Sequence, residues 1–326
     1  MTKLSLYQRF DQLFKESYRK NPHSLFCKAV TNISPLAGPF KKAIKDHKHR
    51  HSFKKILQTG PMACHPAAAT EVHTLVSYPH VFMYLVAIKS FLRFCHNVAV
   101  VVHDDGSLSP LDIKLLENHI RGIKVIRKKD ADKKIYPMLG NYPNSLKCRQ
   151  DNVMGLQLFD IVLLSQANKI INLDSDGLFF TEPGEIMEWI SDNDPSAIKV
   201  LYEYAPMEQK EFLAMFDCPL QPNICVALSC FSKEIFNLEL IEGILRQGGS
   251  YWQRHWCVNQ NIFPILCHAQ SGDHKVSFLD ADAYGSLYWR EHSPVFQHYQ
   301  ISAFLKNYQR HQLEADQVIS ELKGPK

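Results

Sequence analysis

Two aspartates separated by one residue are the sequence feature with the clearest chemistry. Asp174 and Asp176 directly follow the apolar run KIINL at 169–173. The run predicts a buried strand, and residues i and i+2 of an extended chain point to the same side. Two convergent carboxylates at a strand end suit a hard cation such as Mg²⁺ or Mn²⁺, which also binds phosphate oxygens. A metal site at these aspartates is therefore the prediction, with an ordinary polar turn as the alternative.

The elements that position this pair alternate between strand and helix from residue 70 onward. Ser109 and Pro110 predict the start of one helix, as N-cap and first helical residue. The predicted strands are 71–78, 97–103, 123–126, 169–173, 197–202, 225–229 and 275–279, and the predicted helices are 80–94, 110–119, 151–166 and 232–247. Several of these runs are apolar on both faces, which is typical of a mostly parallel sheet covered on each side. The sequence predicts an α/β fold whose ligands bind at the carboxyl ends of the strands.

A strand that ends in D-x-D after two β-α units resembles the metal-binding motif of GT-A glycosyltransferases. The order of the following segments resembles the family-8-type retaining enzymes, over roughly residues 70–305. The resemblance implies a Rossmann-like, mostly parallel central sheet flanked by helices. It also implies metal-dependent transfer of a sugar from a nucleotide-diphosphate sugar to an acceptor. Asp174 and Asp176 would then hold Mn²⁺ or Mg²⁺ and contact the ribose.

Two further segments resemble parts of the nucleotide site in this family. The loop HDDGSL at 103–108 resembles the Asp-rich loop near the base, so Asp104 or Asp105 would accept a hydrogen bond from the base or the ribose. An ordinary turn is an equal alternative for this loop. Arg149, in LKCRQD, lies where related enzymes have a basic residue near the donor. A salt bridge at the start of a helix is an equal alternative for Arg149.

The second half contains partial matches to the family's donor-sugar and diphosphate motifs. In WCVNQNIF at 256–263, Asn259 replaces the usual Asp of a D-Q pair that lines the donor-sugar pocket, and Gln260 is retained. We expect this pair to carry the catalytic role. His298, in FQHYQ, resembles the late histidine that completes the metal site. Asn223 is a weak match to another motif, and Lys306 is the nearest cation for the diphosphate, because the family's G-x-x-K-P-W tail is missing.

Two other classes of function compete with sugar transfer. Paired aspartates also serve metal-dependent nucleotidyltransferases and phosphohydrolases. The sequence lacks the G-x-x-x-x-G-K-[ST] and G-x-G-x-x-G phosphate loops and a second acidic cluster near the first strand. A non-catalytic protein that binds sugar nucleotides is the other alternative, because the D-Q pair is altered. Retaining glycosyl transfer is the interpretation that we favour.

The charge of the chain is divided between two segments. The 326 residues have a formal net charge of +4. Residues 1–60 hold 13 Lys and Arg residues against three acidic ones, about +10, whereas residues 61–326 carry about −6. We predict a basic helical extension at 1–60 and a catalytic domain at 61–326. One interpretation of the extension is a docked helix, amphipathic at 6–18, followed by a solvated basic linker at 41–55. The other is attachment to a membrane surface, through residues 1–55, or to an acidic partner.

The composition of the chain indicates its cellular compartment and excludes some classes of partner. The nine cysteines show no C-x-x-C pair, which favours free thiols in a reducing compartment. No run of about 18 apolar residues occurs, and the first 20 residues lack the apolar region of a signal peptide. The net charge is too weak to indicate nucleic-acid binding. We expect a cytoplasmic enzyme, either fully soluble or peripheral to a membrane.

Overall fold

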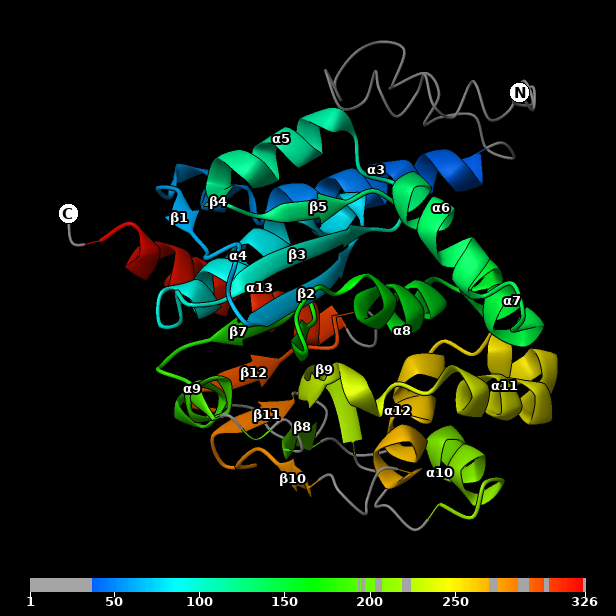
Figure 1. Cartoon of the computed structure of the whole chain (residues 1–326). Coiled ribbons are helices and arrows are strands. Elements are labelled where there is room, and N and C mark those ends of the chain that lie inside the picture. Colours follow the sequence, from blue (N-terminus) through cyan, green and yellow to red (C-terminus); the bar gives the residue numbers. More distant parts are fainter. Residues whose placement is uncertain are drawn as a thin grey trace.

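A seven-stranded sheet forms the centre of the computed structural model (Figure 1). The structure describes residues 37–324 except 193, 195–196, 203–206, 219–223, 270–274, 287–292 and 302–304. In spatial order the strands are β10 (Lys275–Phe278), β8 (Ala197–Tyr202), β9 (Ile224–Ser232), β6 (Lys169–Leu173), β2 (Thr70–Val76), β3 (Ala99–Asp104) and β5 (Lys124–Ile126). β9 runs antiparallel to both neighbours, and the other neighbouring pairs are parallel. The predicted mostly parallel sheet is confirmed.

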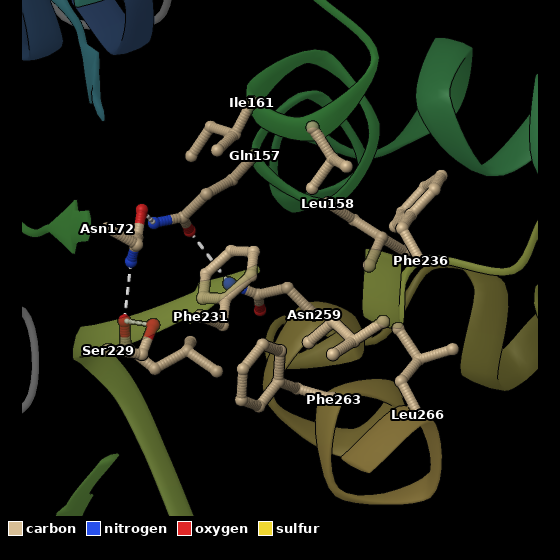
Figure 2. Close-up of a pocket in the computed structure, with 13 residues that line it drawn as sticks. Gln157, Leu158, Ile161, Asn172, Ser229, Phe231, Phe236, Asn259, Phe263 and Leu266 are labelled. Carbon is tan, nitrogen blue, oxygen red and sulfur yellow. Dashed lines mark hydrogen bonds between the residues drawn. The ribbon is translucent and has the colours of Figure 1, made fainter. Parts of the chain in front are cut away.

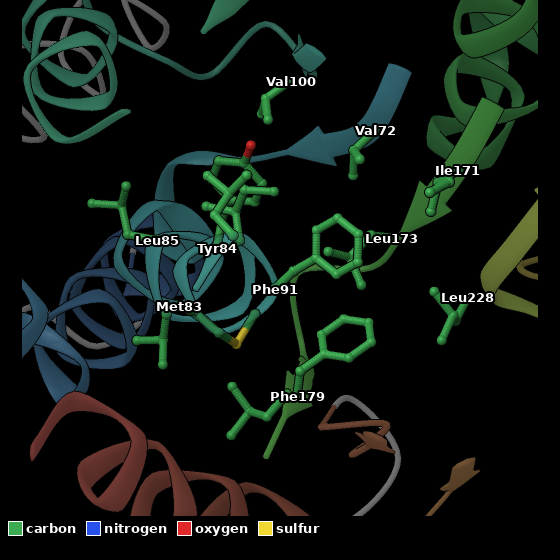
Figure 3. Packing of buried hydrophobic residues seen from close by; sticks show 14 of the residues in the cluster. Val72, Met83, Tyr84, Leu85, Phe91, Val100, Ile171, Leu173, Phe179 and Leu228 are labelled. Atoms are coloured by element: carbon green, nitrogen blue, oxygen red, sulfur yellow. The ribbon is translucent and has the colours of Figure 1, made fainter. Parts of the chain in front are cut away.

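Helices cover both faces of this sheet. On one face, α4 (Val81–Leu92) packs on side chains such as Val72, Val100 and Leu173 (Figure 3). On the other face lie α8 (Val153–Leu164) and α12 (Val258–Ala269), which pack on residues such as Ile170 and Val226. Ile170 and Ile171 are adjacent in β6 and enter different core clusters, because successive strand residues point to opposite faces. The continuous apolar runs of the strands fit a sheet buried on both sides.

The remaining elements lie around these layers. The helices are α3 (Ala37–Ser52), α5 (Pro110–His119), α6 (Lys128–Met138), α7 (Pro143–Asp151), α9 (Gly184–Ser191), α10 (Met207–Ala214), α11 (Leu238–Gln253) and α13 (Leu305–Leu322). The short elements are η1 (Lys54–Gln58), η2 (Tyr78–His80), η3 (Lys233–Ile235), β1 (Met62–Ala63) and β4 (Ile120–Arg121). Ser109 caps α5 as predicted, in a capping box with Asp112. None of the helices in the described ranges is long and apolar enough to cross a membrane.

The helix α3 occupies most of the basic run that the sequence analysis interpreted as a solvated linker. Arg50 of α3 is buried and pairs with Asp112 of α5 at 2.6 Å. Its guanidinium also donates to the carbonyl of Tyr78 at 3.0 Å and lies over the ring of Phe82. The linker interpretation is therefore wrong for the helical part of the run, because a buried ion pair and ring contacts fix it to the domain. The amphipathic stretch at 6–18 and Asn223 lie outside the described residues, and the boundary at residue 60 stays a prediction.

Candidate metal centre

The D-S-D segment forms a tight connection between the large sheet and a smaller one. The backbone N–H of Asp174, directly after β6, donates to the carbonyl of Ala227 on β9 at 2.8 Å. The N–H of Gly177 then donates to the carbonyl of Asp174 at 3.3 Å, and Gly177 begins β7 (Gly177–Phe179). Both aspartates therefore lie at the carboxyl end of β6, where parallel α/β sheets bind their ligands.

The smaller sheet places a histidine from near the end of the chain beside these aspartates. Its three strands are β11 (Tyr284–Ser286), β12 (Phe296–His298) and β7, in that order. β12 runs antiparallel to β7, and His298 is the register partner of Gly177. A Cβ at Gly177 would lie 2.6 Å from two ring atoms of Phe296, so the ring of Phe296 packs in the space that a side chain at residue 177 would need.

Asp174, Asp176 and His298 converge on one point. One ligand atom from each of the three lies within 4.8 Å of the others. The His298 Nε2 atom is 3.4 Å from Asp176 Oδ1, and the two side chains are only 8% and 14% exposed. Two carboxylates and an imidazole form a donor set that suits Mn²⁺ or Mg²⁺. The three residues predicted to be metal ligands are therefore brought together.

The surroundings of Asp176 keep its carboxylate ionised. Burial alone would raise the pKa of Asp176, but the charge and hydrogen bond of His298 outweigh burial, and the pKa falls below its usual range. The backbone N–H of Ile301 adds a hydrogen bond to Oδ2 at 3.1 Å, and that of Tyr299 binds the Asp176 carbonyl at 3.1 Å. An ionised carboxylate is the form that a cation needs.

Three more histidines, which the sequence analysis missed, interact electrostatically with Asp176. His49 of α3, His80 of η2 and His311 of α13 come from three separate parts of the chain. Burial and the neighbouring His80 lower the pKa of His49 to about 4, and burial lowers that of His311 to about 3. His49 and His311 are therefore neutral near pH 7.

The predicted catalytic pair lies at the start of α12, and one member is linked to the metal centre. Asn259 is buried, and its Nδ2 donates to Gln157 Oε1 at 2.7 Å (Figure 2). Gln157 Nε2 in turn donates to Asp174 Oδ1 at 2.8 Å. Gln260 is partly buried, and its carbonyl accepts a hydrogen bond from Gln209 at 3.0 Å. No pattern in the sequence singled out Gln157.

Asp104 and Asp105 lie at the carboxyl end of β3, on the same edge of the sheet as the D-S-D segment. Asp104 Oδ1 accepts hydrogen bonds from the N–H groups of Gly106 and Leu108, at 2.8 and 3.0 Å. Asp105 Oδ1 accepts from the N–H of Ser107 at 2.9 Å. Gly106 has a φ of 98°, which favours glycine. Both carboxylates thus stabilise the turn, as the turn interpretation predicts, and Asp105 remains partly exposed.

The two predicted cationic residues lie on the helices α7 and α13. Arg149 of α7 is fully buried, and its guanidinium nitrogens donate to Asp160 and Asp132. This arrangement agrees with the salt-bridge interpretation. Lys306 is exposed in the first turn of α13.

Comparisons with known proteins identify the fold. No protein-family model matches this chain, and no curated protein matches it by sequence. Among solved structures, the galactosyltransferase LgtC, in complex with donor and acceptor sugar analogs, superposes with a TM-score of 0.52 at 12% identity, covering 78% of this chain and 95% of that one. The mouse xyloside xylosyltransferase 1 gives 0.48 at 16% identity, covering 74% and 99%. The mannosyltransferase Ktr4p from S. cerevisiae gives 0.44 at 8%, covering 82% and 84%.

The likeness to LgtC concerns the fold, since the identity is only 12%. It covers 78% of a chain whose centre is the large, mostly parallel sheet that the sequence predicts. The chain therefore has the GT-A fold, an α/β architecture with a mostly parallel central sheet.

Proposed function

We propose that this protein is a metal-dependent glycosyltransferase that moves a sugar from a nucleotide-diphosphate sugar to an acceptor with retention of configuration. The observation that carries the proposal is the convergence of Asp174, Asp176 and His298 at the carboxyl end of β6. The likeness in fold to a galactosyltransferase solved with donor and acceptor sugar analogs supports it.

Each part of the proposed site has a separate task. Asp174, Asp176 and His298 would hold Mn²⁺ or Mg²⁺, which when bound offsets the negative charge of a leaving nucleoside diphosphate. Asp105, partly exposed on the same sheet edge, is the proposed contact for the nucleoside, with Asp104 shaping its turn. Gln260 and Asn259 are proposed to line the donor-sugar side. Lys306 is the proposed contact for the diphosphate, and the buried Arg149 is left out of the donor site.

A panel of donors provides the test. Purified protein with Mn²⁺ is incubated with UDP-, GDP- and ADP-sugars, and the release of nucleoside diphosphate is measured. We expect release with at least one donor, and a loss of about 100-fold or more in Asp176→Asn, because a carboxylate that offsets developing charge is removed. Asp130→Asn, which changes an exposed carboxylate on α6, is the matched control.

The products separate the alternatives. Release of inorganic phosphate or of a nucleoside monophosphate would indicate the nucleotidyltransferase or phosphohydrolase class instead. Binding of a sugar nucleotide without turnover would indicate a non-catalytic protein. Undiminished release in Asp176→Asn would show that the D-S-D segment is not the site. The anomeric configuration of the product, read by NMR, tests retention.

A further inference from the structure

A chain of three side-chain amides ends on the first aspartate of the metal centre. Gln157 of α8 is buried, and its Nε2 donates to Asp174 Oδ1 at 2.8 Å and to Asn172 Oδ1 at 3.1 Å. Its Oε1 accepts from Asn259 Nδ2 at 2.7 Å (Figure 2). Gln157 thus connects Asn259, in the altered donor-sugar motif on α12, to the carboxylate of Asp174 at the end of β6 through two hydrogen bonds.

The hydrogen-bond partners at the two ends of this row of amides determine which way each amide group points. Asn172 Nδ2 donates to the backbone carbonyl of Val226, which can only accept, so Asn172 Oδ1 is the atom that faces Gln157. The carboxylate of Asp174 also only accepts. Gln157 must therefore present its NH₂ group to both, which leaves Oε1 toward residue 259. Residue 259 must then be a donor, and an ionised aspartate cannot donate.

A cavity beside the three amides further restricts the direction in which the Gln157 amide can point. A cavity of about 40 Å³ adjoins Gln157, Asn172 and Asn259, and its other walls include Leu158, Ile161, Phe231 and Phe263. Most of this wall is apolar, so an amide turned away from its partner would find few replacement groups. A buried hydrogen-bonding group without a partner costs about 1–3 kcal/mol. The amide chain therefore has one favourable arrangement.

We propose that Gln157 is a positioning residue of the metal centre, and that Asn259 fixes the direction of its amide. Gln157 holds one oxygen of Asp174 and so sets the orientation in which this carboxylate meets the cation. This inference rests on the proposed metal site. It also accounts for Asn259, which stands where the family that this sequence resembles has an aspartate. An ionised aspartate at position 259 would accept a hydrogen bond from the Gln157 NH₂ group, and the Gln157 amide would have to turn. Its Oε1 atom would then face the carboxylate of Asp174.

Direct binding of Mn²⁺ tests the inference without any donor or turnover. The affinity for Mn²⁺ alone is measured by electron paramagnetic resonance titration of free Mn²⁺, in the full chain and in Gln157→Leu, Asn259→Asp and the double variant. We expect each single variant to bind about 10–100-fold more weakly, as is usual when a partner of a metal ligand is lost. The double variant should be no weaker than Gln157→Leu, because both changes break one chain.

Two controls make the outcomes distinct. Ser229→Ala removes a buried hydroxyl beside the same cavity. This hydroxyl donates to the Val226 carbonyl at 3.4 Å, and the variant leaves that carbonyl its hydrogen bond from Asn172 Nδ2, so the Mn²⁺ affinity should stay unchanged. If the full chain binds no Mn²⁺, or Asp176→Asn binds it equally well, the proposed metal site itself is wrong. If the full chain binds Mn²⁺ and both single variants bind within twofold of it, the positioning role is wrong. Should Gln157→Leu fail to fold, the isosteric Asn259→Asp decides alone.

Discussion

The guanidinium group of Arg149 is enclosed by two carboxylates inside the helical layer. Nε and Nη2 donate to the two oxygens of Asp160 at 2.6 and 2.8 Å, and Nη1 donates to Asp132 at 2.8 Å. Burial alone would lower the pKa of Arg149, but Asp160 and Asp132 outweigh burial and raise it above its ordinary value. In such a cluster each charge depends on the other for compensation.

Replacing Arg149 by Leu should therefore act on stability. The change leaves Asp160 buried without its partner, so we expect the free energy of unfolding to fall by about 3–5 kcal/mol. Urea unfolding followed by circular dichroism measures this loss. The double variant Arg149→Leu with Asp160→Leu should lose less than Arg149→Leu alone, because the buried charge of Asp160 is removed and Asp132 keeps its ion pair with Lys128 at 3.2 Å. An unchanged stability combined with a raised KM for the donor would instead support the donor-site interpretation.

Residues of the metal centre differ in how far the sequence alone could reveal them. Asp174 and Asp176 follow one strand, so local spacing was enough to predict their convergence. His298 reaches them through the pairing of β12 with β7, and only the family resemblance pointed to it. Gln157 contacts Asp174 because of how α8 lies on β6, and the histidines of α3 and α13 approach through packing. Such long-range placements leave no local pattern.

At the scale of elements, hydrogen bonds to the side chain of Glu71 connect β2 to the turn between α8 and β6. Its Oε2 accepts hydrogen bonds from Ser165 Oγ and from the N–H groups of Gln166 and Ala167. His73 lies 3.1 Å from the same oxygen. Burial alone would raise the pKa of Glu71, but the hydrogen bonds from His73 and Ser165 outweigh it and lower the pKa to about 2. The folded state thus favours the ionised carboxylate.

This shift predicts a pH-dependent contribution to stability. The folded pKa lies below the ordinary value, so the contribution is complete above about pH 5.5 and is lost as the pH falls from about 4.5 toward 2. We expect Glu71→Gln to be less stable than the parent at pH 7, with a difference that shrinks below pH 4.5. Urea unfolding at pH 7, 5.5, 4 and 3 measures it, with the exposed Glu117→Gln as control. A difference that stays constant down to pH 3 would contradict the ionised role.

The strands of the large sheet were predictable because they are apolar runs, whereas the strands of the smaller sheet were not predicted. In the large sheet β6 and β8 match the predicted bounds, and the ends of the other five strands differ by up to three residues. β7 and β12 have three residues each, too few for a periodic pattern. The helix predicted at 232–247 begins later, at Leu238, because Asn237 accepts the N–H of Leu240 as a cap and η3 occupies 233–235. Local side-chain hydrogen bonds decide these boundaries.

At the scale of the whole molecule, the metal centre connects two sheets. Asp174 and Asp176 lie between β6 of the large sheet and β7 of the smaller one, and His298 ends β12. Helix α13 follows β12 and packs against α4 and η1, so the last described helix contacts elements from the first part of the described chain. A cation held by all three side chains would therefore hold together parts that are far apart in sequence.

Mn²⁺ should consequently raise the thermal stability of the whole domain. A ligand that binds only the folded state adds about 2.7 kcal/mol when present at 100 times its Kd. We expect the melting temperature to rise with Mn²⁺ concentration in differential scanning fluorimetry and to return after addition of EDTA. Asp176→Asn should show no rise. An equal rise in that variant would place the stabilising ion elsewhere on the protein.

Because Gly177 has no side chain, it is part of the sequence pattern by which other proteins with this site could be found. The Phe296 ring fills the space that a Cβ at residue 177 would take, and Phe296 lies two residues before the third ligand on the same strand. The sequence signature of this site is then two short motifs taken together, D-x-D-G and, much later in the chain, F-x-H. A sequence that keeps the aspartates but carries a larger residue at the fourth position would be expected to have a smaller residue in place of the phenylalanine, and a search on D-x-D alone would not tell the two apart.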